Sequence, residues 1–207
     1  MSRSVAVLVG SLRAQSINRI TARALARVAE GSLDFDFVEI GDLPLYNEDL
    51  WQDGRGPAPV ERMKAQVAAA DAVLLVSPEY NRAVPGVLCN ALDWGSRPPG
   101  KSVWSRKPAA CVGASQGAIG TAAGQVHLKA RMVTLGMVAM GHPEFYLRFE
   151  PEKYAEDGSV QDENLRKFLK TYMDAFARHI ERLGSPPVWQ CPSAPARSSR
   201  KDSSANA

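Results

Sequence analysis

Cysteine is scarce in this chain of 207 residues. The three cysteines, Cys89, Cys111 and Cys191, stand far apart and are odd in number, and no CxxC pair or Cys/His cluster occurs. This excludes the usual zinc-binding spacings and a disulfide framework. Scattered free cysteines are typical of proteins in a reducing compartment, so we expect a cytoplasmic protein with no metal site.

Long apolar runs and an excess of one charge are also missing. No long apolar stretch follows the basic start of the chain, so neither a signal peptide nor a membrane span is expected. The formal net charge is only +3, and residues 185–207 carry three basic side chains against one acidic side chain. The rest of the chain is close to neutral. This argues against a nucleic-acid partner, because binding a phosphate backbone needs a concentrated cationic face.

What the chain does have is a regular alternation of apolar patterns. Hydrophobic residues make up 45% of it, enough for the core of one α/β domain. Continuous apolar runs predict buried strands, and apolar residues spaced three and four apart predict helices. The strands are predicted at residues 5–9, 35–40, 72–76, 108–113 and 137–140, and the helices at residues 16–30, 60–70, 85–94, 118–135 and 162–183.

Such alternation predicts a parallel sheet with helices on both faces. We expect a three-layer, doubly wound α/β fold of the flavodoxin-like kind, with five strands in the order 2-1-3-4-5. Residues 1–184 would form this single domain. Residues 185–207 are rich in Ser, Pro, Ala, Arg and Lys, bury too little apolar area to fold, and are expected to form a disordered tail. Ligands of such sheets bind at the carboxyl ends of the strands.

The loop after the first strand brings hydroxyl, amide and guanidinium groups to the start of a helix. Ser11, Ser16 and Asn18 can donate hydrogen bonds, Arg13 supplies positive charge, and a helix N-terminus attracts anions. The loop matches neither GxGxxG nor GxxxxGK[ST], which disfavours dinucleotide and P-loop sites. It suits the terminal phosphate of a ligand. In the alternative interpretation, Ser16 only caps the helix and Arg13 is a solvated charge.

The loops after the third and fourth strands suit a flat ring. Residues 78–81, Pro-Glu-Tyr-Asn, lead into a stiff turn that can offer backbone groups to a heterocycle. Residues 115–120 are rich in glycine, which lets the backbone approach a ligand closely. Each loop alone is equally compatible with an ordinary turn. Because all three loops meet at one sheet edge, a phosphate site at one end and a ring site at the other predict FMN.

These segments together resemble the NAD(P)H-dependent FMN reductase family, which includes soluble quinone and chromate reductases. The resemblance rests on residues 10–18, 78–81, 90–94 (Asn-Ala-Leu-Asp-Trp) and 115–120, and spans roughly residues 5–183. It implies an FMN-dependent oxidoreductase that passes electrons from NADPH or NADH to a small acceptor such as a quinone, a flavin, an azo dye or chromate. The implied phosphate contacts are Ser11, Arg13, Ser16, Ile17 and Asn18; the implied ring contacts are Pro78, Glu79, Tyr80 and Asn81, with Ser115, Gln116 and Gly117 on the other side.

The resemblance further implies a homodimer or homotetramer with the flavin near a subunit interface. The helix at 85–94 would then be an interface helix with Trp94 exposed, although Trp94 as ordinary core fits the sequence equally well. Two positions depart from some quinone and chromate reductases, since Arg82 replaces a tyrosine and Val126 replaces an aromatic residue. In those relatives both positions join an interface network with a carboxylate that matches Glu144. Arg82 and Glu144 are therefore substrate or interface candidates, and Arg82 is also a candidate for the extra phosphate of NADPH.

Two other kinds of protein fit the predicted flavin site. A non-enzymatic electron carrier would bind FMN but would need a separate reductase. Such carriers are typically acidic, whereas this sequence has a pI near 8.8. A regulatory flavoprotein would bind FMN and show negligible turnover. In the enzyme, by contrast, FMN would carry the chemistry and no catalytic side chain would be required.

Overall fold

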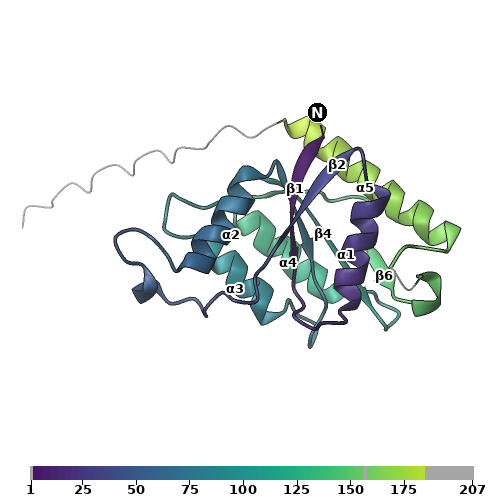
Figure 1. The fold of residues 1–207 in the computed structure, drawn as a ribbon, viewed down its shortest axis with the longest axis horizontal. Coiled ribbons are helices and arrows are strands. Elements are labelled where there is room, and N and C mark those ends of the chain that lie inside the picture. Colours follow the sequence, from purple (N-terminus) through teal and green to yellow (C-terminus); the bar gives the residue numbers. More distant parts are fainter. Residues whose placement is uncertain (1, 156–157, 185–207) are drawn as a thin grey trace, which may run out of the picture.

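A computed structural model of the chain describes residues 2–155 and 158–184. A parallel sheet lies between two layers of helices, with β1 running from the N-terminus toward the edge at which α1 begins (Figure 1). The strands are β1 (Arg3–Val9), β2 (Leu33–Val38), β3 (Ala72–Val76), β4 (Pro108–Ser115), β5 (Val138–Ala139) and β6 (Tyr146–Arg148). The α-helices are α1 (Ile17–Val28), α2 (Ala58–Ala69), α3 (Gly86–Gly95), α4 (Ala122–Thr134) and α5 (Glu163–Leu183).

The strand order is β2-β1-β3-β4-β5, and every strand pair is parallel, which confirms the predicted fold class. The central strands β1, β3 and β4 are the continuous apolar runs of the sequence, because both of their faces are covered by helices. Strand β2 lies at an edge and leaves Asp34 and Asp36 exposed. The carboxyl ends of the three central strands therefore meet at one edge of the sheet.

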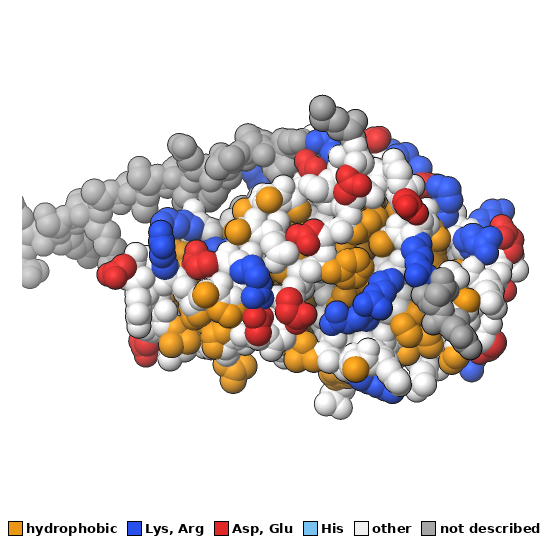
Figure 2. Space-filling model, viewed as in Figure 1, with side chains coloured by type: hydrophobic (Ala, Val, Ile, Leu, Met, Phe, Trp, Pro, Cys, Tyr) orange, Lys and Arg blue, Asp and Glu red, His pale blue; other side chains and the backbone are white. Residues whose placement is uncertain are grey.

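Alternating residues of each central strand pack into two separate hydrophobic cores, one on each face of the sheet. Val5 and Val7 belong to the core under α1 and α5, whereas Ala6 and Leu8 belong to the core under α2, α3 and α4. Helix α5 begins at Asp162, whose side chain accepts the Leu165 N–H at 2.7 Å, and its predicted apolar face is buried apart from the partly exposed Phe168. On the face seen in Figure 2, basic and acidic side chains are interspersed, with hydrophobic side chains scattered between them.

The strand predicted at residues 137–140 is present as β5, but the prediction missed a further short strand, β6. The fifth position of the sheet is shared by two short strands: β5 pairs with the start of β4, and β6 pairs with its end. Pro143 lies between them, and proline cannot donate a hydrogen bond to a strand ladder. The segment does carry a strand signal, since buried Phe145, Leu147 and Phe149 alternate with exposed Tyr146 and Arg148, but the search for long continuous apolar runs did not select it.

Helix α4 begins at Ala122, four residues later than the predicted start at residue 118. Gly120 and Thr121 both have positive φ angles, 54° and 69°, so they cannot continue a right-handed helix. The segment from Gln116 to Thr121 is therefore a loop at the carboxyl end of β4.

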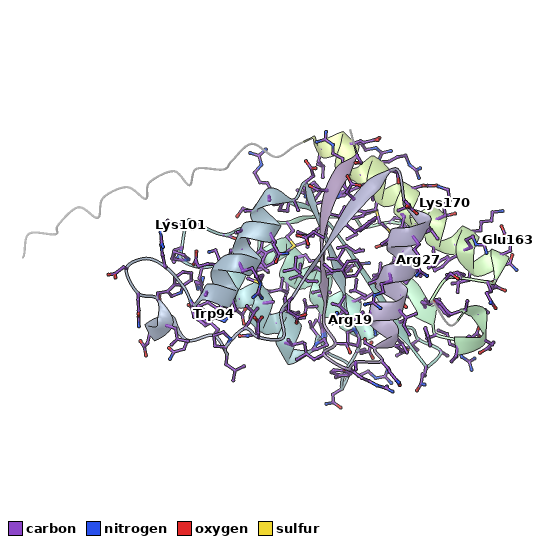
Figure 3. All side chains as sticks on the ribbon, viewed as in Figure 1. Arg19, Arg27, Trp94, Lys101, Glu163 and Lys170 are labelled. Atoms are coloured by element: carbon purple, nitrogen blue, oxygen red, sulfur yellow. The ribbon has the colours of Figure 1, made fainter. Side chains whose placement is uncertain are left out.

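Helix α3 anchors the long segment between β2 and α2. Trp94 is fully buried, so the expectation of an exposed interface tryptophan is wrong. Its Nε1–H donates to Pro44 O at 2.7 Å, and the Asn90 amide donates to the same oxygen at 2.9 Å while accepting the Tyr46 N–H at 2.8 Å. In Figure 3, Trp94 lies on the α2–α4 side of the sheet, and Arg19 and Arg27 lie on the α1 side. The Asn-Ala-Leu-Asp-Trp segment thus has a structural role.

The predicted tail at residues 185–207 lies outside the described residues. Among the helices at residues 2–155 and 158–184, none is both long enough and apolar enough to cross a membrane.

Candidate functional site

Three loops meet at the carboxyl ends of β1, β3 and β4 and enclose a cleft of about 270 Å³. All but two of the predicted cofactor residues line it. Asn81 and Gly117 are the exceptions, and Ala114 lines the cleft although no sequence pattern selected it. The lining consists of Ser11, Arg13, Ser16, Ile17, Asn18, Pro78, Glu79, Tyr80, Ala114, Ser115 and Gln116.

The loop after β1 forms the anion-binding end of the cleft. Ser16 is the N-cap of α1, and its Oγ accepts the Arg19 N–H at 3.2 Å. Because the oxygen is the acceptor in that bond, the Ser16 hydroxyl proton is left to donate to a ligand. The first turn of α1 contains no acidic residue, so nothing there opposes an anion at the helix N-terminus. Ser16 therefore serves both as the helix cap and as a potential phosphate ligand.

Ser11 adds a second donor at the same end. The residue is only 5% exposed, and its hydroxyl has no hydrogen-bond partner among the described residues. Ser11 lines the cleft, so its hydroxyl is available to donate a hydrogen bond to a ligand there. Arg13, two residues further along the loop, is exposed and lines the same cleft. A ligand phosphate would satisfy Ser11 and neutralise Arg13 together.

Asn18 joins the loop after β1 to the end of β4. Its Nδ2 donates to Ala114 O at 3.0 Å, and its Oδ1 accepts the Ala114 N–H at 2.9 Å. The residue is only 2% exposed, so these bonds are shielded from water. Two of the three site loops are thus held at a fixed separation by one amide side chain. Asn18 has a positioning role that its place in the sequence did not reveal.

The segment after β3 ends in a tight hairpin turn. Tyr80 and Ala83 exchange both backbone hydrogen bonds, at 3.2 and 3.0 Å, and the two residues between them, Asn81 and Arg82, have φ angles of 52° and 65°. Positive φ at both central positions defines a type I′ turn. Asparagine adopts this conformation readily, whereas arginine does so rarely. The sequence motif therefore predicts the turn at Asn81 but not the strained backbone at Arg82.

Glu79 connects this turn to the third site loop. Its Oε2 accepts the Gly124 N–H at 2.9 Å, in the first turn of α4, and its Oε1 lies 3.4 Å from Arg82 Nη1. The N-cap residue Thr121 makes no side-chain capping bond, so Glu79 caps α4 from another part of the chain. A carboxylate is favoured at a helix N-terminus. The contact holds the Pro-Glu-Tyr-Asn segment against the start of α4.

The backbone strain at residue 82 leads to a stability prediction. Arg82→Gly is expected to be about 1 kcal/mol more stable than Arg82→Ala, because only glycine adopts a positive φ without steric cost. Both variants lose the ion pair to Glu79, so their difference isolates the backbone effect. Urea denaturation of the two variants measures it, and an alanine variant as stable as the glycine variant would contradict the strain.

The loop after β4 closes the ring end of the cleft. Ser115 Oγ donates to Gly117 O at 3.1 Å, and Ser115 O accepts the Phe149 N–H at 2.8 Å. A side chain at Gly113 would place its Cβ 2.1 Å from Thr121 Oγ1 and 2.3 Å from Ser77 O. Only glycine therefore allows the ends of β3 and β4 to approach this loop.

Some titratable groups near this edge stay outside the cleft. Glu144 accepts hydrogen bonds from Lys129 Nζ at 2.7 Å and Tyr146 Oη at 2.6 Å, which lower the pKa of Glu144 and raise the pKa of Tyr146 to about 12. Arg82 pairs with Glu79, so within one chain it does not reach Glu144. Burial raises the pKa of the Cys111 thiol to about 11, so this cysteine is not a thiolate at neutral pH.

Hydroxyl and guanidinium groups at one end of the cleft, Pro78 and Tyr80 at the other, and a sheet of order 2-1-3-4-5 are the features expected of a flavin-binding α/β protein. Sequence comparisons identify its family. Residues 3–152 match the NADPH-dependent FMN reductase family. The chain is 48% identical over 180 residues to a 2-hydroxy-1,4-benzoquinone reductase of Burkholderia sp., with 87% of this chain and 97% of that protein covered.

Two further relatives agree. A quinone reductase of Pseudomonas putida is 47% identical over 178 residues, which cover 86% of this chain and 95% of that protein. The structure of FerB, a flavoenzyme NAD(P)H:acceptor oxidoreductase from Paracoccus denitrificans, superposes with a TM-score of 0.85 at 48% identity and covers 88% of this chain and 99% of that one. The chain belongs to the NADPH-dependent FMN reductase family. It is an oxidoreductase that uses NAD(P)H and FMN, as the sequence resemblance implied.

Proposed function

We propose that this oxidoreductase binds FMN in the cleft after β1, β3 and β4 and reduces small quinones with electrons from NAD(P)H. The observation that supports the site is the meeting of three loops, distant in sequence, around one cleft whose donors suit a phosphate at one end. The observation that supports the acceptor is the high identity to relatives named as quinone reductases. A free flavin, an azo dye or chromate is a less favoured acceptor.

The loop after β1 would hold the phosphate group. Ser11 and Ser16 would donate hydrogen bonds from their hydroxyl groups, and Arg13 would supply the countercharge. Ile17 and Asn18 form the first turn of α1, whose N-terminus would face the phosphate. Asn18 keeps this loop in register with β4 through Ala114. Binding affinity for FMN would come mainly from this end.

The ring end would be formed by Pro78, Glu79 and Tyr80 on one side and by Ser115 and Gln116 on the other. Asn81 and Gly117 contribute by shaping the turns and do not line the cleft. Bound FMN would supply the redox chemistry between NAD(P)H and the acceptor. The protein's part is to orient the ring and to leave one face open, since Tyr80 is 54% exposed at the rim.

Several finer properties belong to the same proposal. Arg82, with a side chain that is 70% exposed beside the cleft, would favour NADPH by pairing with its extra phosphate. Glu144 would take part in contacts between subunits of a homodimer or homotetramer. We also propose that residues 1–184 form the catalytic domain and that the enzyme works in the cytoplasm.

An absorbance spectrum of the purified protein, followed by anaerobic addition of NADPH and then of 1,4-benzoquinone, tests the function. A yellow protein should bleach with NADPH and recover its colour with the quinone faster than free FMN does. A colourless protein that FMN does not stabilise against heat would rule out the flavin site. If NADPH bleached the protein only in the presence of a separate reductase, the protein would be an electron carrier. If the colour bleached with NADPH but did not return with 1,4-benzoquinone, the quinone would be excluded as the acceptor.

Removing the phosphate countercharge gives a quantitative prediction. Arg13→Ala should weaken FMN binding about 10- to 150-fold, the value of a charge-assisted hydrogen bond of about 1.5–3 kcal/mol. Arg19→Ala is the matched control, because it removes one positive charge from the first turn of α1 (Figure 3), at a position that does not line the cleft. Fluorescence titration with FMN measures both. Equal losses of FMN affinity in the two variants would mean that Arg13 acts only through a general electrostatic effect.

A further inference from the structure

A second hollow, of about 440 Å³, lies between the loop after β5 and the last turns of α5. It is far from the candidate flavin cleft. Ala139 in its lining pairs with Ala109 near the start of β4, whereas Ser115 in the flavin cleft ends that strand. Figure 1 shows the C-terminal end of α5 beside the start of β1, at the opposite end of the sheet from the loop into α1. The two sites share no lining residue.

Every titratable side chain in the lining of this hollow is basic. Arg178, His179 and Arg182 come from α5, and His142 comes from the loop that joins β5 to β6. Neither Arg178 nor Arg182 forms an ion pair with a described residue. A cation in the last turn of a helix is favoured by the helix dipole, which accounts for Arg182 alone. It does not account for three further basic side chains around the same space.

His179 is held in a fixed orientation. Its Nε2 lies 2.8 Å from Val138 O, and because a carbonyl oxygen only accepts, Nε2 must be the protonated nitrogen in this contact. The other ring nitrogen, Nδ1, takes no part in this contact.

The loop side of the hollow also offers backbone donors. The N–H groups of Gly141 and His142 have no acceptor among the described residues. The nearest carboxylate along this loop, Glu144, is already engaged by Lys129 and Tyr146 and is absent from the lining. Unpaired guanidinium groups and free N–H groups around one space are the donor set that recognises phosphate oxygens.

We propose that this hollow is a binding site for a small phosphate-bearing anion, independent of the flavin site. A volume of about 440 Å³ is within the range of small-molecule sites, about 300–1,000 Å³, so the space admits either inorganic phosphate or a phosphate monoester of a small molecule. The two arginines, one helical turn apart on α5, would bind the phosphate oxygens, and His142 and His179 would add donors from either side.

Titrations with inorganic phosphate and with ribose 5-phosphate test the proposal. The full chain is saturated with FMN beforehand, because the flavin cleft itself suits phosphate, and total ionic strength is held constant with chloride. Isothermal titration and thermal unfolding should show saturable binding and stabilisation. In Arg178→Ala/Arg182→Ala the affinity should fall at least 10-fold. Equal affinity for the two ligands would identify inorganic phosphate as the ligand, and tighter binding of ribose 5-phosphate would identify a phosphate ester.

Matched variants separate this site from other effects. Lys167→Ala/Lys170→Ala removes the same two charges from the N-terminal half of α5 and should bind phosphate as the wild type does. Arg182→Gln, which keeps a polar side chain, is a second test if the double variant folds poorly. The proposal is overturned if neither ligand binds saturably, if the arginine variants bind as tightly as the wild type, or if only Arg13→Ala abolishes binding, which would place the ion in the flavin cleft.

Discussion

Asn18→Ala is expected to lower the free energy of unfolding by about 2–5 kcal/mol and to weaken FMN binding. The substitution removes two buried hydrogen bonds and leaves the N–H and C=O groups of Ala114 without partners in an enclosed place. Since the amide is the link between the loop after β1 and the end of β4, its loss should also let the phosphate and ring ends of the cleft move apart. Urea denaturation and FMN titration measure the two effects.

Asn90→Ala is the matched control for this prediction. Asn90 bridges the Tyr46 N–H and Pro44 O in the same way, but it anchors the segment after β2, which does not line the cleft. A loss of stability comparable to that of Asn18→Ala is expected, with FMN affinity nearly unchanged. If both variants lost FMN affinity equally, the effect would be general destabilisation, and the positioning role of Asn18 would be refuted.

Gly120→Ala is expected to cost about 2–5 kcal/mol of stability as well, for a different reason. Gly120 has a φ of 54°, where a side chain costs about 1–2 kcal/mol, and a Cβ there would lie 2.5 Å from Leu147 N. Relieving that contact requires a backbone shift in β6, at a further cost of about 1–3 kcal/mol. For a domain of this size, a loss of this kind lowers the melting temperature by roughly 5–15 °C.

Gly117→Ala tests whether the effect is specific to Gly120. Gly117 lies in the same loop, and a Cβ there would meet nothing nearer than Ser115 Oγ at 3.8 Å. The free energy of unfolding of this variant, measured by thermal unfolding, should therefore differ from that of the wild type by no more than about 0.5 kcal/mol, as for an unstrained surface change. A melting temperature of Gly120→Ala close to that of Gly117→Ala would mean that the loop and β6 shift at little cost.

Much of the candidate site could be predicted from local sequence, because its parts are local. A helix N-cap such as Ser16, a proline-containing turn after Pro78 and a glycine-rich loop at Gly117 are each written in a few consecutive residues. Their convergence followed from the strand order, which follows in turn from alternating strands and helices. The cleft lining agrees with this prediction in all but Asn81, Gly117 and Ala114.

The errors of the sequence-based prediction concern features that depend on residues distant in the sequence. Trp94 carries no local signal that separates a core position from an interface position, and its burial depends on Pro44, fifty residues earlier. Strand β6 was missed because it has only three residues, and its pairing with the end of β4 depends on the tertiary structure. Sequence periodicity detects elements that bury a whole face, and it does not detect those held mainly by partners elsewhere in the chain.

The sequence by itself determined the layered α/β fold, the strand order and the residue types at the carboxyl edge, since these depend on hydrophobic period and local turn chemistry. Only the tertiary structure decided which of those residues line the cleft and which position their neighbours. The link from Asn18 to Ala114, the capping of α4 by Glu79 and the basic hollow around Arg178 and His142 all join residues from separate elements. A hydrogen bond or a charged space of this kind depends on distances in three dimensions, and spacing along one chain does not encode those distances directly.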